Sequence, residues 1–289
     1  MPRFSTFSIA ACDLKTKSWG VAVASKFPAV GAAVPWVNAE VGAVATQSYV
    51  NTSYGPDGLA MMKEGLSAQE TLDKLLAGDP EREIRQVGIV DAQGGSVTFT
   101  GNKCHAWAGG LTGPGYAIQG NILTGIDVVQ KMEEAFLETE GDLPARLYAA
   151  LYAGDRAGGD KRGRQAAAIY VAKPQGGYGG FLDRWIDYRV DDHIDPVPRL
   201  GELLELHELY MGKSPESERV QLEGRVLINL QKIMAKLGYY QAHIDGSYSP
   251  AIAEALSAFL GNENFEERAN PKEGWIDAPV LAYIFDKFK

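Results

Sequence analysis

The sequence predicts an α+β fold in which two stacked antiparallel sheets are covered by helices on both outer faces, a four-layer α-β-β-α sandwich. Strand-like segments occur in pairs, separated by pairs of helix-like segments, whereas a doubly wound fold would alternate single strands and helices. Several strands are apolar on both faces, which is typical of strands buried between two layers. The chain has 289 residues, 45% of them hydrophobic and 22% charged, as in an ordinary globular protein.

The strand-like segments are runs of small and β-branched apolar residues bounded by turn-forming residues. They are predicted at 6–12, 19–25, 40–50, 116–121, 164–174 and 184–192. Two more lie on either side of Gly94 and Gly95, a pair that predicts a hairpin turn.

Helices are predicted at about 56–64, 68–77, 125–138 and 144–153. Ser67 and Glu70 have the spacing of a capping box at the start of the second helix. A fifth helix is expected to begin at Pro196, with Asp195 as its cap, because proline favours the first helical position.

The character of the chain changes near residue 212. The last part shows three helix signals and no convincing strand. The first helix is predicted to be capped by Ser214 and to begin at Pro215, and Pro250 is expected to begin the second. We therefore predict a first domain over 1–212 and a small three-helix domain over 213–289.

Composition excludes several classes of function. The net charge of −9 argues against a nucleic-acid partner, which requires a basic surface. The two cysteines form no CxxC motif and are expected to be buried thiols. No signal peptide or membrane-spanning run is visible, so a cytoplasmic protein without a membrane partner is expected. No cofactor motif or metal-ligand cluster is found, and none is expected.

Several motifs resemble a known superfamily. The opening "TFSIAACDLKTKSWGVAVASKF" is similar to the start of N-terminal-nucleophile (Ntn) hydrolases, the superfamily of the proteasome β subunit. Together with "ATQSYVNTSYGPDGL", "GPGYAIQGNIL", "GDKRGRQAA" and "RWIDYRVDDHIDPV", it resembles an uncharacterised bacterial family assigned to that superfamily, over about residues 4–212. The resemblance implies the same four-layer sandwich. Chains of this superfamily often form oligomers, so the resemblance also implies that this chain can associate with copies of itself as a homo-oligomer.

The segment "LGYYQAHIDGSYSP" and the later "GWID" are similar to a three-helix peptidoglycan-binding-like module. That pattern usually has Gln after the Phe of its second helix, where this chain has Leu260. The resemblance implies peptidoglycan fragments as partners. The alternative is a small packing module.

The resemblance assigns the nucleophile to Thr6, which would need a free α-amine as its base. Removal of "MPRFS", for instance by an autolytic cut between Ser5 and Thr6, would expose that amine. Lys26 is the nearby cation, since no Lys or Arg occurs from Phe27 to Met62. Ser25 stands near the position where the proteasome pattern has an aspartate. The alternatives are that Thr6 is an ordinary strand residue and Lys26 a solvated charge.

The remaining candidate residues would hold the substrate, expected to be a small amide or a peptide-like molecule. N–H groups of the loop with Asn51, Ser53 and Gly55, at the start of a helix, are candidate oxyanion donors. Arg164 could clamp a substrate carboxylate. Two further polar candidates at the end of a strand are Gln119 and Asn121. The sequence therefore favours an Ntn-type amide hydrolase, and the alternative is a non-catalytic binding or assembly protein on the same fold.

Overall fold

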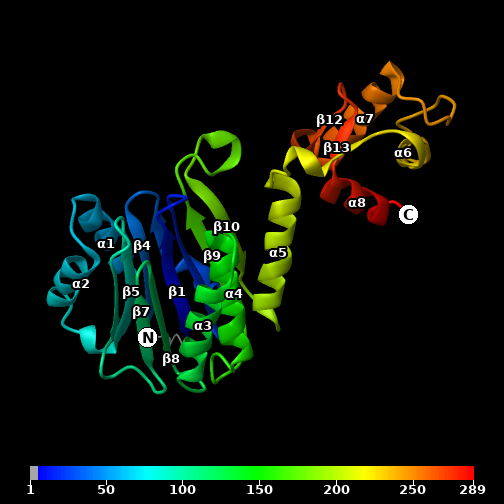
Figure 1. Cartoon of the computed structure of the whole chain (residues 1–289). Helices are drawn as coiled ribbons and strands as arrows, with labels where there is room; N and C mark the ends of the chain where they lie inside the picture. Colours follow the sequence, from blue (N-terminus) through cyan, green and yellow to red (C-terminus); the bar gives the residue numbers. More distant parts are fainter. Residues whose placement is uncertain (1–5) are drawn as a thin grey trace. The chain divides into compact units, whose positions relative to one another are not determined.

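In the computed structural model, which describes residues 6–289, the chain divides into two compact units, unit 1 up to Glu202 and unit 2 over Leu203–Lys289. The division falls within helix α5 (Pro196–Met211). The described residues form eight α-helices and three antiparallel sheets, which confirms the predicted α+β class (Figure 1).

Unit 1 contains a six-stranded and a four-stranded sheet. The larger sheet has the spatial order β10 (Arg184–Val190), β9 (Ala166–Ala172), β2 (Ser18–Ser25), β1 (Thr6–Asp13), β8 (Tyr116–Asn121) and β7 (Gly109–Gly113). The smaller sheet has the order β3 (Pro35–Asn38), β4 (Gly42–Ser48), β5 (Arg85–Asp91) and β6 (Ser96–Thr100). All strand pairs are antiparallel.

The two sheets of unit 1 face each other, with β1 against β4 and β8 against β5. Helices α3 (Asp127–Glu138) and α4 (Leu143–Arg156) cover the outer face of the larger sheet. Helices α1 (Tyr54–Lys63) and α2 (Ala68–Ala77) cover the smaller sheet from the other side (Figure 1). Residues of β1 therefore alternate between two environments, the space between the sheets and the layer under the helices.

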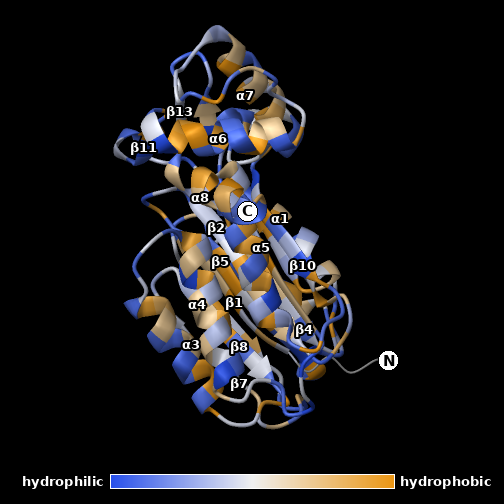
Figure 2. Ribbon diagram, turned by 90° about the vertical axis from the view of Figure 1, so that its right-hand side faces the viewer, coloured by the Kyte–Doolittle hydropathy of each residue, from blue (hydrophilic) through white to orange (hydrophobic). Residues whose placement is uncertain are grey.

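Local sequence signals explain these elements. The capping box at Ser67 and Glu70 is present at the start of α2, and α5 begins at Pro196 as predicted. The hairpin between β5 and β6 turns at Gly94, whose φ of +81° favours glycine. Along α3, polar and apolar residues alternate (Figure 2), and its apolar residues Val128, Val129, Met132 and Phe136 are buried.

Strands β3 and β7 were not expected from the sequence. Strand β7 has the sequence GGLTG, and glycine is depleted in strands, so the segment resembles a turn. Strand β3 begins with Pro35, and proline is tolerated there because β3 lies at the edge of its sheet.

Unit 2 contains the three predicted helices, α6 (Gly224–Lys236), α7 (Pro250–Glu263) and α8 (Ala278–Lys287). It also contains a small sheet of β11 (Arg219–Gln221), β13 (Trp275–Asp277) and β12 (Ala269–Asn270), so the expectation of no strand was wrong. Strands this short leave no detectable alternation in a sequence. The predicted cap and start of the first helix were also wrong. β11 lies between Ser214 and α6, so α6 begins at Gly224 and not at Pro215, and the Ser214 hydroxyl instead accepts a hydrogen bond from Arg268.

Candidate functional site

Thr6 is the first residue of β1 and lies opposite Ser25 of β2 and Asn121 of β8. Its side chain is fully buried. The Thr6 hydroxyl donates a hydrogen bond to Ser25 Oγ at 3.3 Å. Three of the predicted site residues therefore meet at one end of the larger sheet.

A cluster of buried and half-buried polar side chains fills the space between the sheets beside Thr6. We call it the inter-sheet network; it consists of Ser8, Gln47, Gln86, Thr98, Thr100, Gln119 and Asn121. Gln47 is its centre, because its Oε1 accepts from Ser8 Oγ at 2.6 Å and its Nε2 donates to Gln86 Oε1 at 2.8 Å.

The inter-sheet network also holds the backbone of the candidate nucleophile. Gln47 Nε2 lies 3.3 Å from the carbonyl oxygen of Thr6 and 3.3 Å from that of Gln119. Asn121 Nδ2 donates to Gln86 Oε1 at 2.9 Å. A buried network that is satisfied in this way fixes the positions of its members, so the start of β1 has one defined place.

The backbone next to Asn121 is strained. Ile122 has a φ of +51°, which is a genuine outlier for a β-branched residue. Its N–H donates to the His105 carbonyl at 2.9 Å, and its own carbonyl accepts from the Lys161 N–H at 3.0 Å. Such strain persists only where the surroundings impose it, and it is enriched at functional sites.

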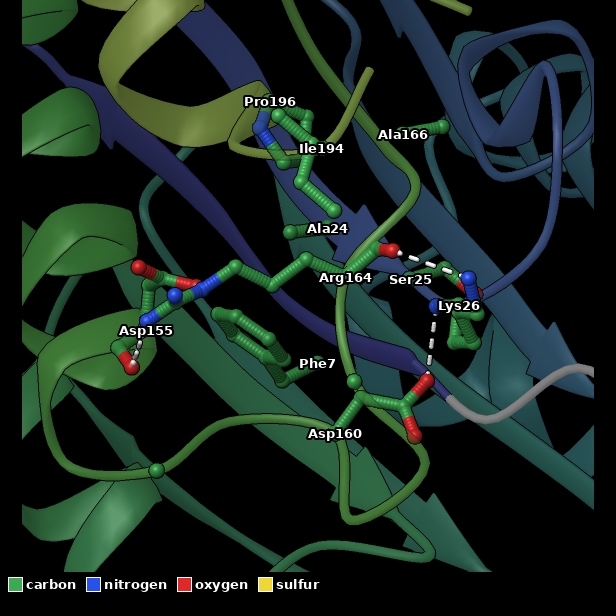
Figure 3. Close-up of a pocket in the computed structure, with 12 residues that line it drawn as sticks. Phe7, Ala24, Ser25, Lys26, Asp155, Asp160, Arg164, Ala166, Ile194 and Pro196 are labelled. Carbon is green, nitrogen blue, oxygen red and sulfur yellow. Dashed lines mark hydrogen bonds and ion pairs between the residues drawn. The ribbon is translucent and has the colours of Figure 1, made fainter. Parts of the chain in front are cut away.

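A cavity of about 400 Å³ lies at the same end of the larger sheet (Figure 3). The residues that line it are Phe7, Ala24, Ser25, Lys26, Asp155, Gly158, Asp160, Gly163, Arg164, Ala166, Ile194 and Pro196. Phe7 points toward the helix layer, since a Cβ on Gly154 of α4 would lie 3.3 Å from its ring. Ser25 joins the cavity to Thr6, because its hydroxyl accepts the hydrogen bond from Thr6.

Two buried aspartates structure one side of this cavity. Asp155 accepts from Arg164 Nε at 2.7 Å and from Arg156 at 2.6 Å. Asp160 pairs with Arg162 at 3.1 Å and accepts from the backbone N–H of Lys26 at 2.7 Å. Burial of these charges is tolerated because each carboxylate is paired and hydrogen-bonded.

The loop with Asn51, Ser53 and Gly55 lies against the smaller sheet, at the start of α1. None of its residues is among those that line the cavity. The N–H groups of Ser53 and Gly55 already donate within the loop, to Asn51 Oδ1 at 3.2 Å and to the Thr52 carbonyl at 3.3 Å. A role as oxyanion donors would require these groups to exchange their acceptors.

The structure thus separates the sequence candidates into three groups. Thr6 and Ser25 lie together, Gln119 and Asn121 belong to the inter-sheet network, and Lys26 and Arg164 line the cavity. Sequence reasoning missed Asp155 and Asp160 at the cavity and the centre of the network, Gln47. A signal for Asp160 was present, because it lies within the motif "GDKRGRQAA".

The cysteines and the remaining ionisable groups of residues 6–289 suggest no further site. Both cysteines are free, as expected; Cys12 is buried, but Cys104 is only half-buried, contrary to expectation. Burial, with the charges of Asp91 and Asp13, raises the pKa of the Cys12 thiol to about 12. Within residues 6–289, no three His, Cys, Asp or Glu side chains are grouped as metal ligands. None of the helices in that range is long and apolar enough to cross a membrane.

Comparison with known proteins places this geometry in a family. The crystal structure of protein SPO2555 from Silicibacter pomeroyi, assigned to the DUF1028 family, is similar with a TM-score of 0.65 and 28% identity, over 71% of this chain and 89% of that chain. No curated protein matches the chain. Residues 210–284 match the family model "Putative peptidoglycan binding domain". Residues 6–200 match the model "Family of unknown function (DUF1028)", and since this is more than half of the sequence, the chain belongs to the DUF1028 family.

Proposed function

We propose that unit 1 is an amide hydrolase of the Ntn kind, and that Thr6 is its nucleophile after a cut between Ser5 and Thr6. The observation that carries this proposal is the position of Thr6. It begins β1, its buried hydroxyl is hydrogen-bonded to Ser25, and Ser25 lines the cavity. The match to the DUF1028 model begins at the same residue.

Two further features support the proposal. Two facing antiparallel sheets lie between two helix pairs, and this is the layer order that the resemblance to Ntn hydrolases implies. The inter-sheet network fixes the Thr6 carbonyl through Gln47, and a nucleophile must be held in place to react efficiently. The Ser25 hydroxyl accepts a hydrogen bond from the attacking oxygen.

The cut and the subsequent catalysis use the same oxygen. In the cut, Thr6 Oγ attacks the Ser5 carbonyl carbon, the peptide C–N bond breaks, and an ester forms while the Thr6 nitrogen becomes an amine. Water then hydrolyses the ester and releases residues 1–5. In catalysis, the amine takes the proton of the Thr6 hydroxyl, Oγ attacks the substrate amide, and the proton passes to the leaving amine as the C–N bond breaks. Water then hydrolyses the acyl ester on Thr6, which releases the acid and restores the hydroxyl. An α-amine has an unperturbed pKa of about 7.7–8.0, which suits a base at neutral pH.

Lys26 is the cation proposed for the site around Thr6. Its backbone N–H is fixed by Asp160, and its Nζ donates to the Arg164 carbonyl at 3.2 Å. Ser25, the residue before Lys26 in the chain, is hydrogen-bonded to Thr6. Gln119 and Asn121 support the neighbouring strand, and the loop with Asn51, Ser53 and Gly55 remains the proposed source of oxyanion donors.

Variants of Thr6 test the proposal. We expect the unchanged chain and Thr6→Ser to lose residues 1–5 during incubation near neutral pH, because both keep a hydroxyl at position 6. Thr6→Ala should stay intact, and Thr16→Ala, in the turn between β1 and β2, should be cut normally. Mass spectrometry of each chain over time measures this. Equal cutting of Thr6→Ala would show that the Thr6 hydroxyl is not the attacking group.

A second function is favoured for unit 2 by its own family match. We propose that residues 210–284 bind peptidoglycan fragments and so direct unit 1 to cell-wall material. The full chain should co-sediment with purified insoluble peptidoglycan and not with cellulose. Equal recovery on both materials, or on neither, would contradict this role.

A further inference from the structure

We infer that the 400 Å³ cavity beside Ser25 accepts a small molecule that carries a carboxylate next to an apolar group, and that Lys26, not Arg164, pairs with that carboxylate. The inference rests on the proposed function only in treating this molecule as the substrate. The volume falls within the range of small-molecule sites.

Arg164 is already committed to protein carboxylates. Its Nε donates to Asp155 Oδ1 at 2.7 Å, and its Nη1 lies 3.7 Å from Asp195 Oδ1. Its Nη2 lies 3.5 Å from the backbone carbonyl of Asp155. Figure 3 shows the side chain extended across the cavity toward Asp155. Because the guanidinium already faces the carboxylates of Asp155 and Asp195, it has no free pair of N–H groups with which to bind a substrate carboxylate.

The carboxylates at the cavity are likewise satisfied by arginines. Asp155 is shared between Arg156 and Arg164, and Asp160 pairs with Arg162. Both aspartate side chains are buried, with exposed fractions of 3% and 2%. They are therefore not positioned to receive a cationic ligand, which argues against an amine as the recognised group.

Lys26 is the charged residue of the cavity that is not paired with an opposite charge within the described residues. Its ammonium donates to a neutral group, the Arg164 carbonyl. In the part of the chain that the structure describes, no carboxylate forms an ion pair with Lys26. The side chain is exposed at the cavity, so an arriving anion can reach it. A point charge with free donors suits a carboxylate.

The other side of the cavity is apolar. Phe7, Ala24 and Pro196 line it, and Ile194 also contributes although it is 84% exposed. In Figure 3, Ile194 and Pro196 lie across the cavity from Phe7. A ligand with an apolar group would remove the Ile194 side chain from water, which is favourable. The cavity therefore matches a carboxylate joined to an apolar group, as in an N-acyl amino acid.

A matched pair of probes tests the charge requirement. Binding of N-acetyl-leucine and of its neutral amide, N-acetyl-leucinamide, is measured to the full chain by ligand-observed NMR titration. We expect the acid to bind more tightly, by roughly fivefold, because a partly exposed ion pair contributes about this much. The preference should weaken as salt is added. Equal affinity for acid and amide would overturn the inference.

Variants assign the effect to Lys26. Lys26→Met should abolish the preference for the acid, whereas Lys26→Arg should keep it. Lys63→Met, which removes an exposed lysine at the end of α1, is the matched control and should bind like the unchanged chain. If Lys26→Met and Lys63→Met bind the acid equally well, Lys26 is not its partner.

The same titration on Thr6→Ala separates this inference from the proposed function. The subsite requires neither the nucleophile nor the cut, so Thr6→Ala should still prefer the acid. If the chain is never cut but the preference is present and depends on Lys26, the hydrolase proposal fails and this inference stands. If the chain is cut at Thr6 but shows no preference, only this inference fails.

Discussion

Asp79 is the residue whose protonation should most affect the stability of unit 1. Burial alone raises the pKa of its carboxyl, but hydrogen bonds from Arg85, the Glu81 N–H, Tyr54 and Asn51 outweigh burial and lower the pKa from 3.8 to about 2. The Arg85 bond is 2.8 Å long. Asp79 thus stabilises the loop that precedes α1 as well as its own turn.

The sign of the pH dependence follows from the lowered pKa. Because the folded state holds the charged form, the stabilisation is complete above the ordinary pKa of 3.8 and is lost as pH falls toward 2. We expect the unchanged chain to lose about 2 kcal/mol more unfolding free energy than Asp79→Asn over this interval. Urea unfolding at a series of pH values measures it. Parallel curves for the two chains would contradict the assignment.

In unit 2, Arg268 is a buried charged residue that should stabilise the fold, as Asp79 does in unit 1. It is 3% exposed, pairs with Asp277 at 2.7 Å, and donates to the carbonyls of Glu208 and Leu209 near the end of α5. Arg268→Met would leave Asp277 buried and unpaired, so unit 2 should lose about 3–5 kcal/mol of stability.

The double variant Arg268→Met with Asp277→Leu is the control for that loss. It removes both charges, so it should recover much of the stability. Hydrogen exchange of the unit 2 amides measures both variants. A double variant as unstable as the single one would show that the hydrogen bonds to α5, rather than the unpaired charge, dominate.

For single residues, the sequence predicts which side chains belong to the candidate site better than it predicts which side chains they contact. Thr6, Ser25 and Asn121 were candidates from their motifs, and they meet in the structure. Gln47 was not, although it is the centre of the inter-sheet network. Its contact with Ser8 is set by how two sheets face each other, which residue spacing along one strand does not encode.

At the scale of elements, close packing between the sheets depends on Gly88 of β5. A Cβ at this position would lie 2.0 Å from Gln119 Oε1. Gly88→Ala should displace Gln119 from Ser8 and Thr98, and should destabilise unit 1 by about 1–3 kcal/mol. Urea unfolding measures this change.

Gly58→Ala is the matched control, because a Cβ on this helical glycine of α1 would meet ordinary contacts at 3.4 Å and beyond. It should be neutral or stabilising by up to about 1 kcal/mol. If the two alanine variants have the same stability, the packing of β5 on Gln119 is not tight.

Strands with regular apolar composition were predicted well, and those with unusual composition were missed. β1, β2 and β8 lie within one residue of their expected bounds. β7 is rich in glycine, and the strands of unit 2 are only two or three residues long. Tertiary pairing stabilises such segments where their local preference does not.

At the scale of the whole molecule, the two units have separate hydrophobic cores and separate family matches. Under the proposed function, unit 2 would bind cell-wall material and unit 1 would act on a small amide. The family match of each unit could be anticipated from its motifs. The cavity could not be anticipated, because its walls come from segments that are distant in sequence: β1, the end of β2, the stretch from the end of α4 to the start of β9, and the start of α5.

The cut between Ser5 and Thr6 is tested most directly by the intact mass of the native chain, produced without an amino-terminal tag, together with amino-terminal sequencing. After incubation near neutral pH, we expect a chain that begins at Thr6, with a free amine beside the hydroxyl bonded to Ser25. A chain that keeps the Ser5–Thr6 bond leaves Thr6 with an amide nitrogen, which has no basicity. That result would contradict an Ntn mechanism and would favour a binding protein on the same fold.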